Sequence, residues 1–413
     1  MKYILVIGDG MADNPVPELN GKTPLGAANK PHIDELAKKS EVGTVRTIPI
    51  GVPAGSDTGI LSIFGYDPRK YYTGRSPLEA AGSGVELKAG DISYRCNMVA
   101  LSDDDVPLAE KVIYSHSGGS IEGDQSIALM KYLLEDARFS AASKKYGMSF
   151  HLNPSFRHIA VQSGGDISGL IATPPHDILK QKIGQYLPKG TGSEPLVELM
   201  TIANEVLANA PINDERRKSG HLPANGIWFW AEGTVASLPS FKEKYSGKTC
   251  AAITAVPLVS GIAALAGGDS IEVEGATGEI DTNYEGKVDA TISALDKGYD
   301  FVCLHVEAPD ECTHNGDLKG KIKAIEYIDS RVIANLVPKL EKRGEDFRIL
   351  IISDHKTLMS TRTHDGEPVP FLIYDSRNKV GSGNSYTEEN GLKGPFVEDG
   401  FTILARLMEL NKQ

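Results

Sequence analysis

The chain of 413 residues lacks the features of secreted and membrane-bound proteins. It contains four cysteines, Cys96, Cys250, Cys303 and Cys312, and no CxxC pair, so nothing indicates a disulfide framework and a reducing compartment is expected. No apolar run approaches the roughly 20 residues needed to span a bilayer, and the start MKYILVIGDG turns polar too early for a signal peptide. These absences predict a cytoplasmic protein that has no membrane partner.

Positive charge is also scarce, because 43 Lys and Arg residues face 55 Asp and Glu residues and the net charge is −12. A field of this sign repels nucleic acid, so no nucleic-acid partner is expected, and an anionic substrate needs a local basic pocket. A Walker-type phosphate loop is missing, since the GKT runs at 21–23 and 247–249 lack the upstream glycine. The balance of 40% hydrophobic and 24% charged residues is typical of a globular protein, and the length predicts two or three domains.

Three short apolar runs end in acidic residues or histidine. Such runs predict buried parallel strands, and the helix-like segments between them predict an α/β fold in which helices cover both faces of a parallel sheet. Sites in such sheets lie at the carboxyl ends of the strands. The strand runs are 3–7, 300–306 and 347–352, and the helix-like segments are 31–40, 285–298 and 319–343.

The character of the chain changes after another predicted strand at 91–101. The stretch 102–125 is rich in Ser, Asp and Gly, and 153–225 mixes Pro and Gly turns with amphipathic helix such as 195–209. We therefore expect a discontinuous first domain, residues 1–97 and 241–413, interrupted by a smaller inserted domain, residues 98–240.

The residues at the strand ends form a candidate metal-binding set. Asp310 and His314 are spaced i, i+4, which places them on one face of a helix. Carboxylates mixed with imidazoles suit Zn²⁺ or Mn²⁺, and the set is large enough for two ions. A single Asp or His of this kind is more often a turn or capping residue, so the joint pattern carries the prediction. The set consists of Asp9, Asp310, His314, Asp354, His355 and His364.

Ser56 is a candidate nucleophile. In the segment 52–66, VPAGSDTGILSIFGY, a turn rich in Pro and Gly gives way to an apolar run, which places Ser56 at or beside a helix N-terminus. The helix dipole there favours an alkoxide and a phosphate. A serine activated by metal ions is suited to phosphoryl transfer, so the sequence predicts a two-metal phosphoryl-transfer enzyme.

Several motifs occur in order along the chain: GDGMAD (8–13), PAGSDTG (53–59), GYDPRKYYTGRSPLEA (65–80), YRCN (94–97), TPPHDI (173–178), HVEAPDECTH (305–314), SDHKT (353–357) and RTHDGEPVPF (362–371). Together they resemble the archaeal-type cofactor-independent phosphoglycerate mutases of the alkaline phosphatase superfamily and their bacterial relatives. The resemblance covers essentially the whole chain. It implies an alkaline-phosphatase-like α/β domain, with a parallel sheet flanked by helices, interrupted by a smaller α/β substrate-binding domain.

The same resemblance implies chemistry and ligands. It implies that 2- and 3-phosphoglycerate are interconverted through a phosphoserine on Ser56, and that two divalent ions, Mn²⁺ or Zn²⁺ with Mg²⁺ as a further option, act without an organic cofactor. One metal site would consist of Asp310, His314 and His364, and the other of Asp9, Ser56, Asp354 and His355.

The expected partner is a small phosphorylated substrate with a carboxylate and a phosphate, which guanidinium groups can bind through paired hydrogen bonds. Arg95 and Arg157 lie in or next to the expected inserted domain, where the resemblance implies substrate binding. The full set of candidates is Arg75, Arg95, Arg157, Arg362 and His176.

One segment departs from the family pattern. Archaeal mutases carry an arginine-rich element where this chain has YSHSGGSI at 114–121, in which His116 is only a weak substitute. Two alternative functions therefore stay open: a small-molecule kinase, for example acting on homoserine with ATP, and a hydrolase of phosphomonoesters or phosphonates. The oligomeric state stays open as well.

Overall fold

The computed structural model describes residues 1–378 and 381–410 and divides the chain into two compact units. Unit 1 comprises Met1–Tyr72, Ala81–Ser83 and Ser237–Gln413, and unit 2 comprises Thr73–Ala80 and Gly84–Ala236. Each unit has its own sheet and helices, which confirms the predicted α/β class with a smaller inserted domain. No helix in the described residues is long and apolar enough to cross a membrane.

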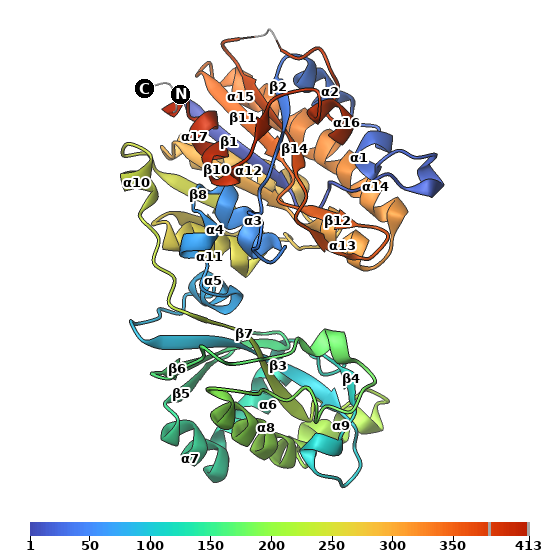
Figure 1. The fold of residues 1–413 in the computed structure, drawn as a ribbon, viewed down its shortest axis with the longest axis vertical. Helices are drawn as coiled ribbons and strands as arrows, with labels where there is room; N and C mark the ends of the chain where they lie inside the picture. The colour runs from blue at the N-terminus through green and yellow to red at the C-terminus, as the bar shows by residue number, and fades with distance from the viewer. Residues whose placement is uncertain (379–380, 411–413) are drawn as a thin grey trace. The chain divides into compact units, whose positions relative to one another are not determined.

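Unit 1 is built on an eight-stranded sheet flanked by helices (Figure 1). In spatial order its strands are β15 (Phe396–Val397), β2 (Glu41–Val45), β14 (Val369–Asp375), β11 (Phe347–Ile352), β1 (Lys2–Gly8), β10 (Phe301–Val306), β8 (Cys250–Ile253) and β9 (Asp269–Ile271). The three runs predicted as strands form the centre, where β1 pairs in parallel with β11 and β10. β14 runs antiparallel to both of its neighbours, so the sheet is mixed rather than wholly parallel.

Packing explains why the central strands are apolar along their whole length. Ile4 and Val6 of β1 share a buried cluster with residues of α2 (Pro31–Lys38), α12 (Tyr284–Asp296), α14 (Leu318–Tyr327) and α15 (Ala334–Lys342). Leu5 and Ile7 point to the opposite face of the sheet and are equally buried. Because both faces are covered, these strands show continuous rather than alternating hydrophobicity.

The helices of unit 1 agree with the predicted segments, with one interruption. The segment 319–343 forms α14, then a π-helical segment, Ile328–Ile333, and then α15. α5 (Arg75–Gly82) contains residues of both units. A short hairpin of β12 (Lys356–Leu358) and β13 (Thr363–Asp365) follows β11. The other helices are α1 (Pro24–Ala27), α3 (Ser56–Ile63), α4 (Pro68–Tyr71), α10 (Phe241–Lys244), α11 (Pro257–Leu265), α13 (Ala308–His314), α16 (Glu388–Gly391) and α17 (Ile403–Leu407).

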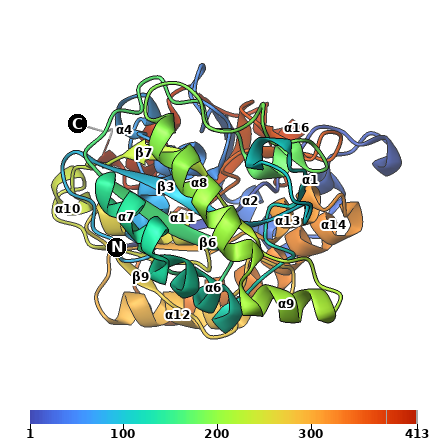
Figure 2. The same ribbon diagram turned by 90° about the horizontal axis from the view of Figure 1, so that it is seen from below.

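Unit 2 contains a five-stranded antiparallel sheet with helices on one face (Figures 1 and 2). The strands are β4 (Ile113–Ser115), β3 (Asp91–Leu101), β6 (Arg157–Ser163) and β5 (Met148–His151) in that order, with β7 (Gly226–Thr234) also paired to β3. The helices are α6 (Gly123–Glu135), α7 (Ala137–Lys145), α8 (Ser193–Ala208) and α9 (Pro211–Lys218). Leu129, Phe139 and Leu199 from these helices share a core with Tyr94 and Trp228 of the sheet.

Unit 2 begins earlier in the chain than the expected inserted domain. β3 starts at Asp91 and pairs with β6 and β7, both of unit 2. The expected boundary between residues 97 and 98 therefore falls inside one continuous strand, all of which belongs to unit 2. The other boundary differs by a few residues, since unit 2 ends at Ala236 rather than at residue 240.

Candidate metal and nucleophile site

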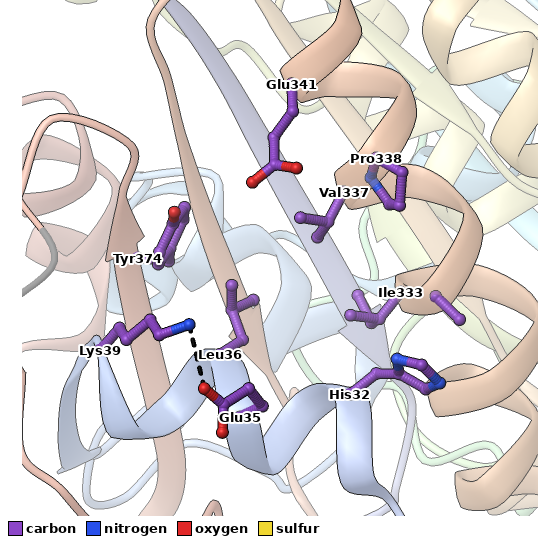
Figure 3. Close-up of a pocket in the computed structure, with 10 residues that line it drawn as sticks. His32, Glu35, Leu36, Lys39, Ile333, Val337, Pro338, Glu341 and Tyr374 are labelled. Carbon is purple, nitrogen blue, oxygen red and sulfur yellow. Dashed lines mark ion pairs between the residues drawn. The ribbon is translucent and has the colours of Figure 1, made fainter.

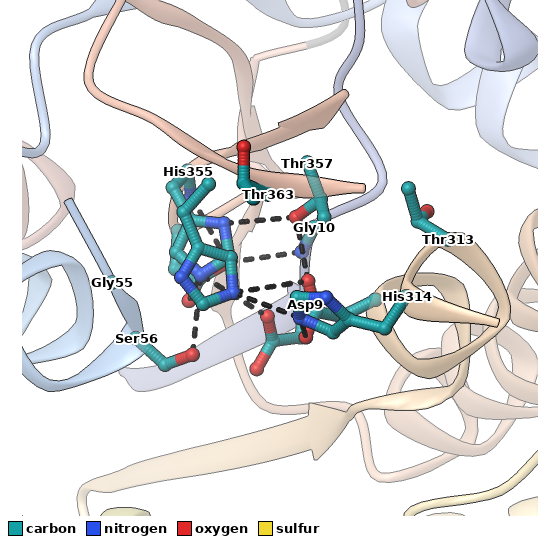
Figure 4. Close-up of polar contacts among 12 residues, drawn as sticks. Asp9, Gly10, Gly55, Ser56, Thr313, His314, His355, Thr357 and Thr363 are labelled. Carbon is teal, nitrogen blue, oxygen red and sulfur yellow. Dashed lines mark hydrogen bonds and ion pairs between the residues drawn. The ribbon is translucent and has the colours of Figure 1, made fainter. Parts of the chain in front are cut away.

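Asp9, Asp354 and His355 meet at the carboxyl ends of neighbouring strands. Asp9 follows β1, and Asp354 and His355 follow β11, so the parallel pairing brings them to the same edge of the sheet. His355 Nε2 lies 3.5 Å from Asp9 Oδ1 and 3.2 Å from Asp354 Oδ2 (Figure 4). All three side chains are buried, and their ligand atoms lie close enough together to hold a metal ion.

Asp310, His314 and His364 form a neighbouring group. Asp310 and His314 lie on α13 as their spacing predicts, with Asp310 Oδ2 3.0 Å from His314 Nε2. His364, on β13, has its Nε2 3.1 Å from His314 Nε2 and 3.6 Å from Asp310 Oδ1. A second possible metal-binding group joins Asp310 and His364 with His355. His355 is thus within reach of both groups, whereas the family resemblance implied that it belongs to one.

Ser56 is the first residue of α3 and lies beside these groups. Its Oγ is 3.1 Å from His355 Nε2 (Figure 4). The helix approaches the Asp354 backbone closely, because a Cβ added at Gly59 would lie 2.5 Å from the Asp354 carbonyl oxygen. The structure therefore brings all seven proposed ligands together: Asp9, Ser56, Asp310, His314, Asp354, His355 and His364.

The charges of this cluster are not balanced by the protein alone. Burial, reinforced by the negative charges of Asp354 and Asp310, raises the pKa of Asp9 well above its ordinary value. Burial acts in the same direction on Asp310, but hydrogen bonds with His314 and His364 hold the pKa of Asp310 well below its ordinary value. Asp9 Oδ1 and Asp354 Oδ2 are buried and have no hydrogen-bond partner among the described residues. Buried carboxylate oxygens of this kind call for a cation, so the residues fit divalent metal ions.

Thr357 and Gly10 support the cluster and were missing from the predicted site. The Thr357 hydroxyl donates to Asp310 Oδ1 at 2.5 Å, and its oxygen lies 3.1 Å from His355 Nδ1, so it links the two groups. The Gly10 N–H donates to Asp354 Oδ1 at 3.1 Å. Gly10 has φ +58°, and a Cβ there would lie 2.6 Å from Asp310 Oδ1. Both residues belong to motifs that carried the resemblance, GDGMAD and SDHKT, which was the available signal.

His305 was also missing from the predicted site. It lies inside β10, and its Nε2 is 2.9 Å from Asp9 Oδ2. Burial, together with the positive charge of Lys287, lowers the pKa of His305 to about 3. The predicted site residues follow strands in the sequence, and His305 lies within a strand, so the pattern did not include it.

Four of the five substrate candidates lie in unit 2, and two of them, Arg75 and Arg95, contact the buried carboxylate of Glu79. The guanidinium of Arg95 binds both carboxylate oxygens of Glu79 and lies 4.7 Å from the centre of the Trp230 ring. Arg75 Nε donates to Glu79 Oε1 at 2.9 Å. His176 lies 5.2 Å from the Trp230 ring.

The remaining candidates are more open. Arg157 is exposed, with its guanidinium 4.9 Å from the Phe156 ring. Arg362 belongs to unit 1, where it is exposed and its carbonyl oxygen is 2.9 Å from His314 Nδ1. His116, the weak substitute in the segment without arginine, lies 6.0 Å from the His176 ring.

A surface pocket elsewhere in unit 1 does not coincide with this chemistry (Figure 3). It lies between α2 and α15 and contains the ion pair of Lys39 and Glu35 at 2.9 Å. Tyr374 lines it and pairs with Ile349 near the start of β11, so the pocket is at the opposite edge of the sheet from Asp354. The strand-end cluster is therefore the stronger candidate site.

Comparisons with known proteins agree on one family. Residues 37–213 match the model of a family described as 2,3-bisphosphoglycerate-independent phosphoglycerate mutase. A relative from Geobacter sulfurreducens, named as a probable enzyme of this kind, is 45% identical over 99% of this chain and 100% of its own. A relative from Methanosarcina acetivorans that bears the same name is 42% identical over 95% of both chains.

Solved structures show the same similarity. A protein from Pyrococcus horikoshii is 31% identical, with a TM-score of 0.79 over 99% of this chain and 97% of its own. A cofactor-independent phosphoglycerate mutase from Thermoplasma acidophilum is 25% identical, with a TM-score of 0.61 over 99% of this chain and 100% of its own. The similarity therefore includes both units.

Proposed function

This chain belongs to the family of 2,3-bisphosphoglycerate-independent phosphoglycerate mutases, and we propose that it interconverts 2-phosphoglycerate and 3-phosphoglycerate with Ser56 as the residue that carries the phosphoryl group. The two relatives described above, which are named for this activity, match at least 95% of the chain. The observation that carries the assignment of Ser56 is its Oγ, 3.1 Å from His355 Nε2 at the edge of the buried carboxylate cluster.

The proposed reaction has two balanced halves. Ser56 Oγ attacks phosphorus and loses its proton, while the bond from phosphorus to the substrate oxygen breaks and that oxygen gains a proton. In the second half, the other hydroxyl of glycerate attacks the phosphorus of the phosphoserine and loses its proton, while the bond from phosphorus to Ser56 Oγ breaks and Oγ gains a proton. The start of α3 favours the negative charge that both halves place near Ser56.

We propose two divalent ions, one held by Asp310, His314 and His364 and the other by Asp9, Ser56, Asp354 and His355. When bound, the ions would lower the pKa of the Ser56 hydroxyl and offset charge on the phosphoryl group. The unpartnered oxygens of Asp9 and Asp354 support this proposal. The choice of Mn²⁺ or Zn²⁺, with Mg²⁺ as a further option, stays a prediction, as do the lack of an organic cofactor and the cytoplasmic location.

Within unit 2, we propose that Arg75, Arg157 and His176 bind anionic groups of the small phosphorylated substrate. Within unit 1, Arg362 is the candidate for the same role. Arg95 differs from these because Glu79 and Trp230 already occupy its guanidinium. We therefore propose that Arg95 supports the substrate-binding cluster by fixing Glu79, which in turn holds Arg75.

The decisive experiment is to trap the phosphoenzyme. Wild-type protein loaded with Mn²⁺ and incubated with ³²P-labelled 3-phosphoglycerate should carry label on the peptide that contains Ser56, and Ser56→Ala should carry none and lose mutase activity by several orders of magnitude. Ser62→Ala is the matched control, because Ser62 lies on the same helix and its buried hydroxyl has no hydrogen-bond partner among the described residues. It should keep both label and activity.

Three results would overturn the proposal. Label on another residue, or substantial mutase activity in Ser56→Ala, would remove Ser56 from its role. The same preparations, offered homoserine with ATP and a simple phosphomonoester, test the kinase and hydrolase alternatives. A turnover of either that exceeds mutase turnover would replace the proposed reaction.

A further inference from the structure

Thr254, His305 and Asp9 lie side by side at the ends of three adjacent strands. The sheet order places β10 between β8 and β1, and Thr254 follows β8, His305 is in β10, and Asp9 follows β1. His305 Nδ1 is 3.1 Å from Thr254 Oγ1, and His305 Nε2 is 2.9 Å from Asp9 Oδ2. All three side chains are buried, so water does not compete for these contacts.

The hydrogen bonds determine which nitrogen of His305 carries the proton. A carboxylate that ligates a metal ion is ionised and only accepts, so Nε2 must be the donor to Asp9 Oδ2. The other ring nitrogen, Nδ1, faces the Thr254 hydroxyl, which donates its proton to it. The Thr254 oxygen in turn accepts from the Val256 N–H at 3.0 Å. The Thr254 hydroxyl and both ring nitrogens of His305 therefore each have a compatible partner.

The backbone of His305 is held as well. The buried Lys287 Nζ donates to the His305 carbonyl oxygen at 2.9 Å. Burial lowers the pKa of Lys287 to about 8, although the negative charge of Glu307 acts to raise it. A charged lysine that is buried in this way needs a hydrogen-bond acceptor, which the His305 carbonyl oxygen supplies. His305 is thus held at both ring nitrogens and at its carbonyl oxygen.

The consequence falls on Asp9. One of its oxygens, Oδ2, is taken by His305, whereas the other, Oδ1, has no hydrogen-bond partner among the described residues and lies 3.5 Å from His355 Nε2. We infer that His305 is a positioning residue, which together with Thr254 fixes the orientation of the Asp9 carboxylate and keeps Oδ1 available for a metal ion. This inference rests on the proposed metal sites.

His305 is not itself a suitable ligand. Both of its ring nitrogens are engaged, with Thr254 and with Asp9, and it is not in either of the groups whose ligand atoms could share an ion. A group that orients a ligating residue typically changes metal affinity by about 10- to 100-fold when it is removed. We therefore expect a change in metal affinity of this size when His305 can no longer donate to Asp9.

The test measures Mn²⁺ binding to metal-free protein by calorimetry, independently of activity. Wild type should bind two ions. His305→Met, which removes the donor, should bind one of them about 10- to 100-fold more weakly and leave the other unchanged. His305→Gln is the matched variant, because its amide N–H can replace Nε2–H, and it should bind close to wild type. Thr254→Val should lower the affinity for the same ion, whereas Thr254→Ser, which keeps the hydroxyl, should not.

A second measurement does not depend on whether the variants fold. Nitrogen-15 NMR of wild-type protein should find His305 as the neutral Nε2–H form. The Nδ1–H form, or equal binding of both ions by wild type and His305→Met, would overturn the inference alone. Failure of wild type to bind two ions would overturn the proposed metal sites themselves and, with them, this role for His305.

Discussion

Replacing Glu79 by Gln should destabilise unit 2 strongly. Glu79 is buried, and its carboxylate binds the guanidinium groups of Arg95 and Arg75. Gln is similar in size but carries no charge, so the substitution leaves the volume nearly unchanged and removes the counterion of Arg95. Because Arg95 is itself buried, its charge would remain without a carboxylate partner.

The pKa shifts give the magnitude. Burial alone would raise the pKa of Glu79, but the charges of Arg95 and Arg75 overcome this effect and lower it from 4.5 to about 2. At about 1.4 kcal/mol per pKa unit, this shift corresponds to ~3 kcal/mol. Burial lowers the pKa of Arg95 to about 10 despite Glu79, so the charged pair as a whole contributes little. Removing only Glu79 has a larger effect than removing the whole pair, because the charge of Arg95 then stays buried without a partner. Loss of one partner of a buried pair typically lowers the free energy of unfolding by about 3 to 5 kcal/mol.

Tryptophan fluorescence reports on this unit alone, because both tryptophans of the chain, Trp228 and Trp230, lie in unit 2. Urea unfolding followed by this signal should show Glu79→Gln less stable than wild type by about 3 kcal/mol or more. Glu205→Gln is the matched control in the same unit, since Glu205 pairs with Arg138 at the exposed surface and such a pair contributes about 1 kcal/mol at most. Equal stability of the two variants would refute the reasoning.

Three further predictions follow from other parts of the structure. The lowered pKa of Glu79 means that its charge stabilises the fold above the unfolded pKa of 4.5, so unit 2 of wild type should lose stability as the pH falls from 4.5 to about 2, and Glu79→Gln should lose less over that range in the same fluorescence assay. Gly10→Ala should weaken Mn²⁺ binding in calorimetry, because the added Cβ would collide with Asp310. Gly21→Ala is the control, because Gly21 has φ +77° and nothing within 4 Å of an added Cβ, so this variant suffers backbone strain alone. Equal Mn²⁺ affinity in the two variants would contradict the prediction. Adding 2,3-bisphosphoglycerate should leave the mutase rate unchanged if Ser56 carries the phosphoryl group, and a strict requirement for it in a coupled assay would point to another carrier.

The sequence was informative about elements whose residues are close together in the chain. The apolar runs at 3–7, 300–306 and 347–352 became adjacent strands because a buried parallel strand needs continuous hydrophobicity. The antiparallel direction of β14 and the place of the whole of β3 in unit 2 were not predicted. Both depend on which strands pair, and pairing partners are set by packing between segments far apart in the chain.

The candidate site shows the same division in finer detail. The Arg75 and Glu79 pair, spaced i, i+4 on α5, could have been found from the sequence, because helix geometry alone places such residues together. Its second partner, Arg95, could not, since it reaches Glu79 only after β3 joins the sheet of unit 2. His305 contacts Asp9 for a similar reason, because the register pairs it with Ile7, two residues before Asp9. Motifs thus located the groups expected to take part in the chemistry, whereas the residues that orient those groups depend on strand register and come from the fold.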